Sequence, residues 1–181
     1  RVFVGLNAEL GETNIYFSDD GGDSWSPLAG PEVGGPISGF VFSPHYSQDG
    51  ILFAIDNVFG DIYTSSGDYS VWIHKITYTG QAVDLALSPD YPDDHTYYTL
   101  ENGPGLWITT DDGETTSPLT IFADYTYATD LIMSSDFTED HTFYVSFFDE
   151  VSVIRSTDSG DNWEPVNRGL QGNFIHTLAF L

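Results

Sequence analysis

Residues 18–25 have the sequence Ser-Asp-Asp-Gly-Gly-Asp-Ser-Trp and fit the pattern Ser-x-Asp-x-Gly-x-Ser/Thr-Trp. A tight hairpin needs a carboxylate that accepts backbone N–H groups and a glycine that tolerates a positive φ. The tryptophan then folds back over the turn and anchors the following strand by burying a large surface. The octapeptide therefore predicts a β-hairpin.

The same pattern returns three times along the chain. Residues 156–163 match it with Asn in the Ser/Thr position, residues 109–116 keep the Asp and Gly but lack the Trp, and residues 65–72 keep the outer Ser and Trp. The first hydroxyl residues of the four copies stand at 18, 65, 109 and 156, so the period is 44 to 47 residues. The residues predicted to be structural in these hairpins are Ser18, Asp20, Gly22, Trp25, Ser65, Trp72, Thr109, Asp111, Gly113, Ser156, Asp158, Gly160 and Trp163.

A second motif runs in register with the first. Residues 42–46 (Phe-Ser-Pro-His-Tyr) recur as 87–91 (Leu-Ser-Pro-Asp-Tyr) and as 133–137 (Met-Ser-Ser-Asp-Phe), each followed by a short apolar run. Two independent motifs with one period indicate an internal repeat. The predicted repeats are approximately 1–43, 44–88, 89–134 and 135–181, within a single domain that spans residues 1–181.

Each repeat predicts four short strands, called A to D. Strand A ends at the Ser-Pro pair, as in residues 83–87, and strand B is the apolar run after the Asp-rich turn; strand C carries the Ile-Tyr pair, and strand D begins near the Trp. Gly, Pro and Asp turns separate the strands and no window shows sustained helical spacing, so the chain is predicted to be all-β. A four-stranded repeat of about 45 residues is typical of a β-propeller blade.

The octapeptide resembles the Asp-box, the bacterial neuraminidase repeat (BNR), and the resemblance covers the whole chain. The Asp-box family of β-propellers includes sialidases, xyloglucanases, sortilin-like receptors and photosystem assembly factors. The resemblance implies four-stranded antiparallel blades, in which the box is a structural turn on the face opposite the usual ligand site. It does not imply one activity, because one fold hosts many functions.

The composition is strongly acidic, since 28 Asp and Glu face four Lys and Arg, for a formal charge of −24. Such a charge repels phosphate backbones and anionic lipid, which argues against nucleic acid and membrane insertion. A solvating surface and a cation-binding surface are the two interpretations of this charge. No cofactor or metal site is predicted, and no motif indicates a structural cation such as calcium.

The chain has no Cys, hence no disulfide framework and no thiolate metal site. No apolar run of transmembrane length is present either. These features predict an extracellular or cell-surface protein of prokaryotic origin, with a cytosolic protein as the alternative. The chain opens directly on strand-like residues 2–4 without a signal peptide, so we expect that a leader or an earlier domain has been removed.

A candidate binding surface follows from the repeat. If the hairpins lie on one face of the propeller, the B–C and D–A loops lie on the other. Carboxylates beside exposed aromatic rings suit a carbohydrate or a basic protein, because sugar faces stack on rings and sugar hydroxyls bond to carboxylates. Ordinary polar loops on an acidic protein are the alternative. The candidate binding residues are Glu9, Glu12, Asp56, Tyr78, Glu101, Tyr125, Tyr127, Asp149 and Glu150.

Catalysis is the minority prediction. A sialidase needs several Arg side chains to hold the substrate carboxylate, and the chain has only three Arg in all. An inverting xyloglucanase needs two carboxylates about 6–10 Å apart, for which Asp56, Glu101 and Asp149 are weak candidates. His95 and His141 occupy equivalent turns, and we interpret them as solvated residues, because separate blades hold them apart and zinc requires convergent ligands.

The two ends of the chain carry complementary strands. Residues 2–6 are predicted as a B strand and residues 174–181 as an A strand, which is able to complete the first blade. A closed four-bladed ring, half of an eight-bladed dimer and part of a longer chain all fit. We favour a longer chain, or self-association through open sheet edges, because unpaired edges invite pairing.

These patterns together predict a non-catalytic extracellular or cell-surface propeller. Its expected partners are a glycan, a protein or further copies of itself, with which it would build a surface structure. A fragment of an Asp-box glycoside hydrolase acting on polysaccharide is the alternative, and a purely structural filament subunit is a third interpretation.

Overall fold

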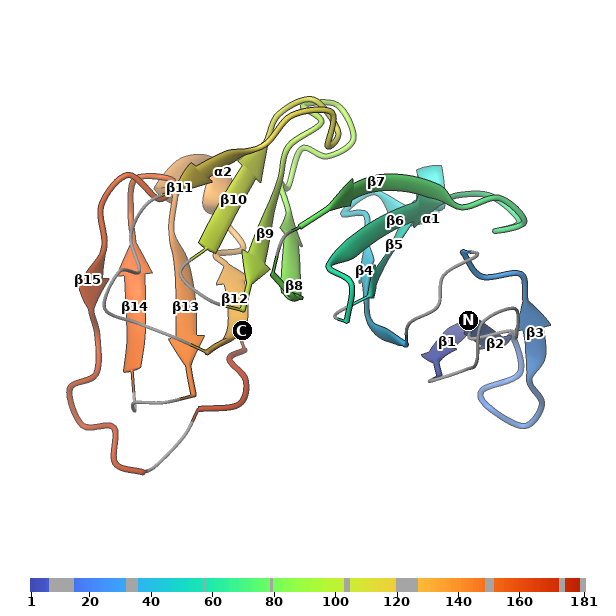
Figure 1. Ribbon diagram of the computed structural model, residues 1–181, viewed down its shortest axis with the longest axis horizontal. Helices are drawn as coiled ribbons and strands as arrows, with labels where there is room; N and C mark the ends of the chain where they lie inside the picture. The colour runs from blue at the N-terminus through green and yellow to red at the C-terminus, as the bar shows by residue number, and fades with distance from the viewer. Residues whose placement is uncertain are drawn as a thin grey trace. The chain divides into compact units, whose positions relative to one another are not determined.

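The computed structural model describes residues 1–6, 15–31, 36–56, 58–78, 80–102, 105–119, 127–148, 152–172 and 175–179. These residues form short β-strands and two single-turn helices (Figure 1), so the all-β prediction is confirmed. The chain falls into two compact units, Arg1–Ala82 and Val83–Leu181. Within the described ranges, no helix has the length and apolar character needed to cross a membrane.

The N-terminal unit contains two antiparallel sheets. Sheet I has the strand order β1-β2-β3 and sheet II the order β4-β5-β6-β7. The strands of sheet I are β1 (Val2–Gly5), β2 (Ile15–Ser18) and β3 (Ser26–Leu28). Sheet II consists of β4 (Ile37–Phe42), β5 (Leu52–Asp56), β6 (Asp61–Ser65) and β7 (Ile73–Thr77), with helix α1 (Tyr46–Asp49) between β4 and β5.

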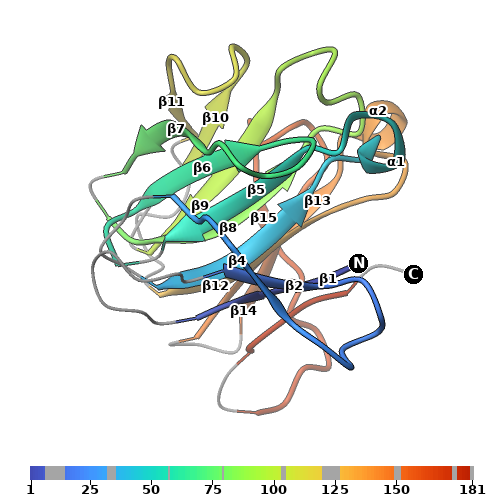
Figure 2. The same cartoon turned by 90° about the vertical axis from the view of Figure 1, so that its right-hand side faces the viewer.

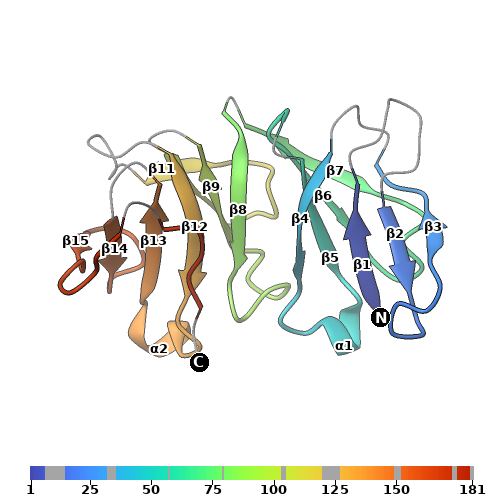
Figure 3. The same ribbon diagram turned by 90° about the horizontal axis from the view of Figure 1, so that it is seen from below.

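The C-terminal unit also contains two antiparallel sheets. Sheet III has the order β8-β9-β10-β11, and sheet IV has the order β12-β13-β14-β15, whose strands lie side by side in Figure 3. The strands of sheet III are β8 (Ala82–Leu87), β9 (Tyr97–Glu101), β10 (Gly105–Thr109) and β11 (Ser117–Leu119). Sheet IV consists of β12 (Ala128–Met133), β13 (Phe143–Phe147), β14 (Ser152–Ser156) and β15 (Glu164–Pro165), with helix α2 (Phe137–Asp140) between β12 and β13.

The strand order confirms the predicted repeat. Sheets II to IV each hold strands A to D in chain order, and sheet I holds strands B to D. The pairing registers agree as well: the first hydroxyl of the hairpin pairs with Val2 in sheet I, Leu52 in sheet II and Phe143 in sheet IV. These three residues are therefore equivalent positions of one repeat. Because side chains alternate along a strand, each sheet also presents equivalent faces.

Helices α1 and α2 are the first departure from the sequence prediction, which indicated only turns between strands A and B (Figure 2). A local hydrogen bond fixes each one: Ser43 donates to Asp49 over 2.6 Å, and Ser134 donates to Asp140 over 2.7 Å. Gly50 ends α1 with a φ of 63°, in the left-handed region. A single turn of four residues is too short to give the helical periodicity on which the sequence prediction relied.

The predicted A strand at 174–181 is the second departure. Its described part, residues 175–179, has no strand assignment. Thr177 Oγ1 and Leu178 N instead donate hydrogen bonds to Asp130 Oδ2 over 2.7 and 2.5 Å, beside β12 (Figure 3). An A strand needs a B strand as its ladder partner, and β1, which the sequence assigned to it, is paired only with β2 in the described part of the chain.

Among the described residues, each unit buries a hydrophobic core between its two sheets. The core of the N-terminal unit consists of Ile15, Leu28, Ile37, Leu52, Ala54 and Tyr69. The core of the C-terminal unit contains Tyr98, Leu100, Leu106, Ala128, Leu131, Phe137, Phe143, Val145, Phe147 and Ile154. In the N-terminal unit, sheet II therefore buries the face that carries Leu52 against sheet I. In the C-terminal unit, sheet IV buries the face that carries Phe143 against sheet III.

Candidate functional site

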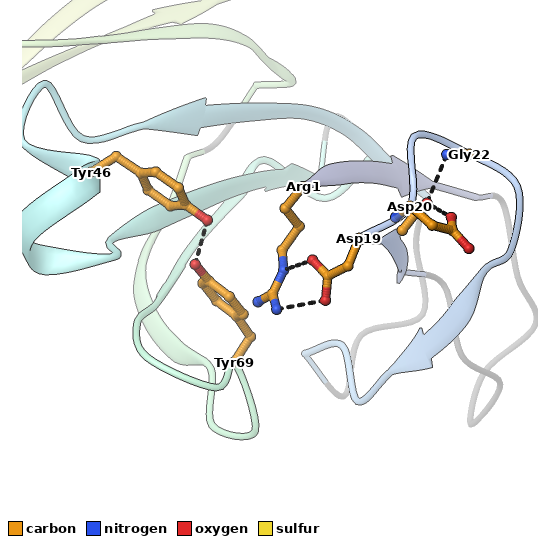
Figure 4. Close-up of polar contacts among 7 residues, drawn as sticks. Arg1, Asp19, Asp20, Gly22, Tyr46 and Tyr69 are labelled. Atoms are coloured by element: carbon orange, nitrogen blue, oxygen red, sulfur yellow. Dashed lines mark hydrogen bonds and ion pairs between the residues drawn. The ribbon is translucent and has the colours of Figure 1, made fainter.

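Three of the four hairpins share one hydrogen-bond network. In the first, Ser18 Oγ accepts the backbone N–H of Gly22 over 2.8 Å (Figure 4). Asp20 accepts the backbone N–H of Ser24 over 3.0 Å and its hydroxyl over 2.6 Å. Residues 109–115 repeat these bonds, with 2.9 Å to Gly113 N. Residues 156–162 repeat them with Asn in place of Ser. In each of these three hairpins, the Asp side chain therefore stabilises the turn by accepting hydrogen bonds within it.

The same bonds lower the pKa of the three hairpin carboxylates. The hydroxyl and backbone N–H of Thr115 lower the pKa of Asp111 to about 2. The hydroxyls of Ser24 and Ser18 lower the pKa of Asp20, and the amide of Asn162 lowers that of Asp158. Hydrogen bonds to the charged form favour ionisation. These side chains are therefore fixed anions of the turn and have no free proton for acid catalysis at neutral pH.

The remaining hairpin, residues 65–72, lacks the Asp and Gly of the pattern but still forms a turn. Ser65 Oγ donates to Val71 O over 2.5 Å, and Asp68 accepts the backbone N–H of Ser70 over 3.0 Å. Trp72 packs against the core of the N-terminal unit. Asp68 therefore stabilises this turn in place of the missing Asp of the pattern, and it binds both the N–H and the hydroxyl of Ser70, two residues later.

The contacts of Arg1 tie the first hairpin to sheet II. Its guanidinium binds Asp19 through two hydrogen bonds of 2.6 and 2.9 Å (Figure 4). The guanidinium also lies 4.9 Å from the centre of the Phe17 ring and 5.9 Å from that of Tyr69, in the hairpin after β6. Behind it, the hydroxyls of Tyr46 and Tyr69 are 2.5 Å apart. Burial and the hydrogen bond to Tyr46 raise the pKa of Tyr69 to about 12, so the phenol of Tyr69 stays neutral. This cluster is structural.

The predicted binding residues that the structure describes are mostly buried, which corrects the expectation of an exposed acidic and aromatic surface. Asp56 is fully buried and its Oδ1 accepts the N–H groups of Val58 and Phe59 over 2.8 and 3.2 Å. Glu101 is buried and accepts Trp107 Nε1 over 2.8 Å. These two carboxylates hold their own loops together, because a buried carboxylate needs such donors.

The other predicted binding residues divide into two groups. Tyr78 is buried, and its backbone N–H donates to Gly60 O over 2.9 Å. Tyr127 is 58% exposed and remains a candidate contact residue. The remaining candidates lie outside the described residues: Glu9, Glu12, Tyr125, Asp149 and Glu150.

The two turn histidines lie on the surface. His95 and His141 are exposed, and each backbone carbonyl accepts an N–H from the following hairpin, at Asp112 and Ser159, over 3.1 Å. Among the described residues, no cluster of three or more His, Asp or Glu side chains has the arrangement of a metal site.

A carboxyl pair in the C-terminal unit was not predicted from the sequence. Asp84 Oδ2 on β8 accepts Leu131 N over 3.0 Å, and Asp84 also hydrogen bonds to Asp130 on β12. Asp130 in turn accepts Leu178 N over 2.5 Å. Each Asp therefore binds a backbone N–H of the next repeat. The available signal was an Asp at the same position of two otherwise apolar A strands.

Burial and the hydrogen bond to Asp130 raise the pKa of Asp84 to about 7. A raised folded-state pKa stabilises the fold below the ordinary pKa near 4, and that stability is lost as the pH rises through about 7. The hairpin carboxylates Asp111 and Asp158 have the opposite effect on stability, because their pKa is lowered in the folded state. Their contribution is present above pH 4 and is lost as the pH falls below it.

We expect the free energy of unfolding of the C-terminal unit to fall by roughly 2 kcal/mol between pH 5 and pH 8. Asp84→Asn removes the ionising group and should flatten this dependence, as measured by urea denaturation at several pH values. An unchanged slope in the variant contradicts the assignment. Ser159→Ala, which leaves the carboxyl pair intact, is the control.

The outer face of sheet I is apolar and open. Val4, Leu6, Tyr16 and Trp25 line a groove of about 410 Å³ whose walls are almost entirely carbon. The exposed fractions are 44% for Val2, 43% for Leu6 and 42% for Trp25. Rings of Phe3 and Phe17 lie on the opposite face and pack toward sheet II. The groove therefore belongs to the face that no described residue covers.

The equivalent faces of the other sheets are buried. Leu52 and Phe143, which are equivalent to Val2, are fully buried. Trp163, which is equivalent to Trp25, lies 5.1 Å from the ring of Phe143 in the C-terminal core. The described residues thus leave uncovered in sheet I the surface that sheets II and IV bury against a preceding sheet.

Comparison with solved structures identifies this architecture. Residues of an ancestral GH74 enzyme align over 96% of this chain and 26% of that one, with a TM-score of 0.68 and 15% identity. YCF48 bound to a D1 peptide aligns over 94% of this chain and 51% of that one, with a TM-score of 0.63 and 16% identity. A chain of the nidogen/laminin complex aligns over 78% and 51%, with a TM-score of 0.62 and 13% identity.

The sheets are β-propeller blades. At these identities the similarity establishes the fold alone. The chain spans about half the length of the YCF48 and nidogen/laminin chains and about a quarter of the GH74 enzyme. No protein-family description and no characterised protein sequence matches the chain.

Proposed function

We propose that this chain is a non-catalytic β-propeller module that binds another protein through the outer face of sheet I. The observation that carries the proposal is the exposure of Trp25 and Val2, at 42% and 44%, on a face whose equivalents are buried in sheets II and IV. Contiguous exposed apolar surface is typical of protein interaction sites, and Trp and Tyr are enriched at their centres.

A protein partner fits this face better than a glycan. The groove is lined by Val4, Leu6, Tyr16 and Trp25, and sugar hydroxyls would find few hydrogen-bond partners there. The carboxylates that the sequence offered for a glycan, Asp56 and Glu101, are buried and engaged with their own loops. The charge of −24 favours a partner whose rim is basic or whose contact is mainly apolar.

We also propose that the module belongs to the Asp-box family and acts outside the cell or at its surface. The family assignment is supported by the hydrogen bonds that Asp20, Asp111 and Asp158 make in equivalent hairpins. The location is supported by the strongly acidic composition, which keeps a surface solvated.

The apolar face is tested by a neutral solvatochromic dye, Nile red, at low protein concentration. Wild-type protein should bind the dye, and Val4→Lys should weaken dye binding by at least about tenfold, because it places a charge in the groove. Thr157→Lys, in the exposed hairpin after β14, adds the same charge away from the groove and should leave dye binding unchanged. Equal dye binding by Val4→Lys and wild type would refute the assignment of the binding face.

Partner binding and catalysis are then tested directly. Selection of displayed extended peptides on wild-type protein should enrich binders that shift the fluorescence of Trp25 and fail to bind Val4→Lys. Release of reducing sugar from xyloglucan or another polysaccharide by wild-type protein would overturn the non-catalytic part of the proposal.

A further inference from the structure

The last strand of sheet II differs from the last strands of the other three sheets. Strands β3, β11 and β15 each carry a proline that pairs with the residue two positions before the first hydroxyl of the hairpin; these are Pro27, Pro118 and Pro165. In sheet II that residue is Tyr63, and it pairs with His74. Strand β7 (Ile-His-Lys-Ile-Thr) contains no proline and has five residues, whereas β3 and β11 have three and β15 has two.

The prolines protect the edges of their sheets, because proline has no N–H to offer to a further strand. A proline stays in a ladder only where its nitrogen points away from the neighbouring strand. His74 occupies the equivalent position, so its backbone N–H points away from β6 and toward the other side of β7. Among the described residues, β7 pairs with β6 alone and forms the edge of sheet II (Figure 1). Strand β7 therefore offers a main-chain donor that β3, β11 and β15 withhold.

Side-chain contacts hold this edge in place. His74 Nε2 lies 3.1 Å from Asp61 Oδ1 and 3.0 Å from Thr77 Oγ1. The imidazole ring also packs edge-on against the ring of Tyr63, at a centroid distance of 5.2 Å. A strand that is already ordered loses little conformational entropy when it binds a partner. The edge of β7 is therefore prepared for pairing.

The side chains around the edge define what it can bind. Val71 and Ile73, at the start of β7, are 68% and 56% exposed. Asp68 is exposed in the hairpin that precedes β7, and Asp61 lies opposite Thr77 at the other end of the strand. The edge is therefore apolar along its first half and has a carboxylate at each end, in a chain whose charge is −24.

We propose that the edge of β7 binds an extended peptide of a partner protein, with apolar side chains at alternate positions and Lys or Arg at both ends. The peptide would add to sheet II as a fifth strand. Main-chain hydrogen bonds to a sheet edge supply affinity, and alternate side chains supply specificity. The basic ends match Asp61 and Asp68. This site is separate from the outer face of sheet I and goes beyond the proposed function.

A second copy of the chain fits this edge poorly. Lys75 is the extra residue of a β-bulge between His74 and Ile76. Pairing of β7 with β7 would bring two bulges and two Lys75 side chains together, and a bulge and a lysine both disfavour the pairing of identical edges. The charge of −24 on each copy adds repulsion. A short peptide needs only the part of the edge around His74.

Fluorescence polarisation with a labelled peptide tests the proposal. The probe is the heptapeptide Lys-Val-Thr-Val-Thr-Val-Lys, and the control probe is the same peptide with alternate backbone amides N-methylated. Wild-type protein should bind the probe at least about tenfold more tightly than the control, because methylation removes the N–H groups that edge pairing needs. Equal binding of the two peptides, or no binding of either, overturns the proposal.

Two variants of His74 test whether the main chain of β7 makes the contact. His74→Pro gives β7 the proline of the other sheets, and His74→Thr is the matched control, because it also loses the imidazole but keeps the backbone N–H. We expect His74→Pro to weaken probe binding at least about tenfold and His74→Thr to stay within about threefold of wild type. Equal binding by the two variants overturns the proposal. The methylated peptide tests the same point on wild-type protein if His74→Pro does not fold.

Val4→Lys separates this inference from the proposed function. The variant changes the groove of sheet I and should bind the heptapeptide as tightly as wild type does. Loss of the heptapeptide in Val4→Lys with retention in His74→Pro would place the peptide in the groove, which overturns the edge site and leaves the proposed function standing. Loss in His74→Pro together with unchanged Nile red binding in Val4→Lys would support the edge site and refute the proposed function alone.

Discussion

Replacing Phe143 with Ala should lower the free energy of unfolding of the C-terminal unit by about 3–5 kcal/mol. Phe143 is fully buried and its ring contacts Tyr98, Phe137 and Trp163 at centroid distances of 5.2, 5.5 and 5.1 Å. Removal of this ring leaves a cavity between sheets III and IV as well as losing the transfer free energy. Urea denaturation followed by tryptophan fluorescence measures the effect.

The control for this prediction is the equivalent position of sheet I. Val2 stands at the same place in the repeat but is 44% exposed, so Val2→Ala should cost less than about 1 kcal/mol. Phe148→Ala, at a ring in the C-terminal unit that is 37% exposed, should likewise cost much less than Phe143→Ala. A small effect of Phe143→Ala would mean that sheets III and IV do not share the core described above.

Replacing Gly160 with Ala should cost about 2–4 kcal/mol. Gly160 has a φ of +98°, which an L-residue adopts only with strain, and a Cβ there would lie 2.9 Å from Leu119 and 3.2 Å from Phe143. The hairpin of sheet IV therefore presses directly on sheet III, so the substitution disturbs both the turn and the core. Thermal or urea unfolding of the variant measures the loss.

Gly22 is the matched control, because it is the same position of the first hairpin. Its φ is +102°, and the nearest contact of an added Cβ is Trp25 at 3.8 Å. Gly22→Ala should therefore cost only the backbone strain, about 1–2 kcal/mol. The difference between the losses of unfolding free energy in Gly160→Ala and Gly22→Ala measures how tightly the hairpin of sheet IV packs against sheet III. Equal costs would contradict this packing.

The sequence predicted the parts of the fold that depend on short-range chemistry. The spacing of Ser18, Asp20 and Gly22 determines a local hydrogen-bond network, and the network forms as the octapeptide predicts. The strand order within each sheet follows from turns that are only a few residues long. Such contacts close within one repeat, so the repeat pattern alone predicts them.

The candidate site was less predictable, because burial depends on what the neighbouring sheet covers. Asp56 and Glu101 are the last residues of strands β5 and β9, and nothing in the local sequence says that they turn inward to bind backbone and indole N–H groups. Trp25 and Trp163 have the same local sequence context, yet only Trp163 lies in a core formed by two sheets. The exposed groove therefore becomes visible only when equivalent positions are compared in three dimensions.

The carboxyl pair was missed for a related reason. Asp84 and Asp130 lie 46 positions apart in the sequence, and each looked like an isolated polar residue in an apolar strand. Their hydrogen bond joins two blades, and the backbone groups that they accept, at Leu131 and Leu178, belong to the next repeat each time. A pattern confined to one repeat contains no information on such contacts.

Amide hydrogen exchange with and without a peptide selected on the wild-type protein tests the central claim most directly, namely that the outer face of sheet I is a binding surface. We predict that fragments covering residues 1–6 and 15–28 exchange more slowly when the peptide is present, and that Val4→Lys shows no such change. Fragments covering β5 and β13 should exchange equally slowly in both conditions, because both of their edges are paired. Protection confined to other sheets, or equal protection in Val4→Lys, would contradict the account.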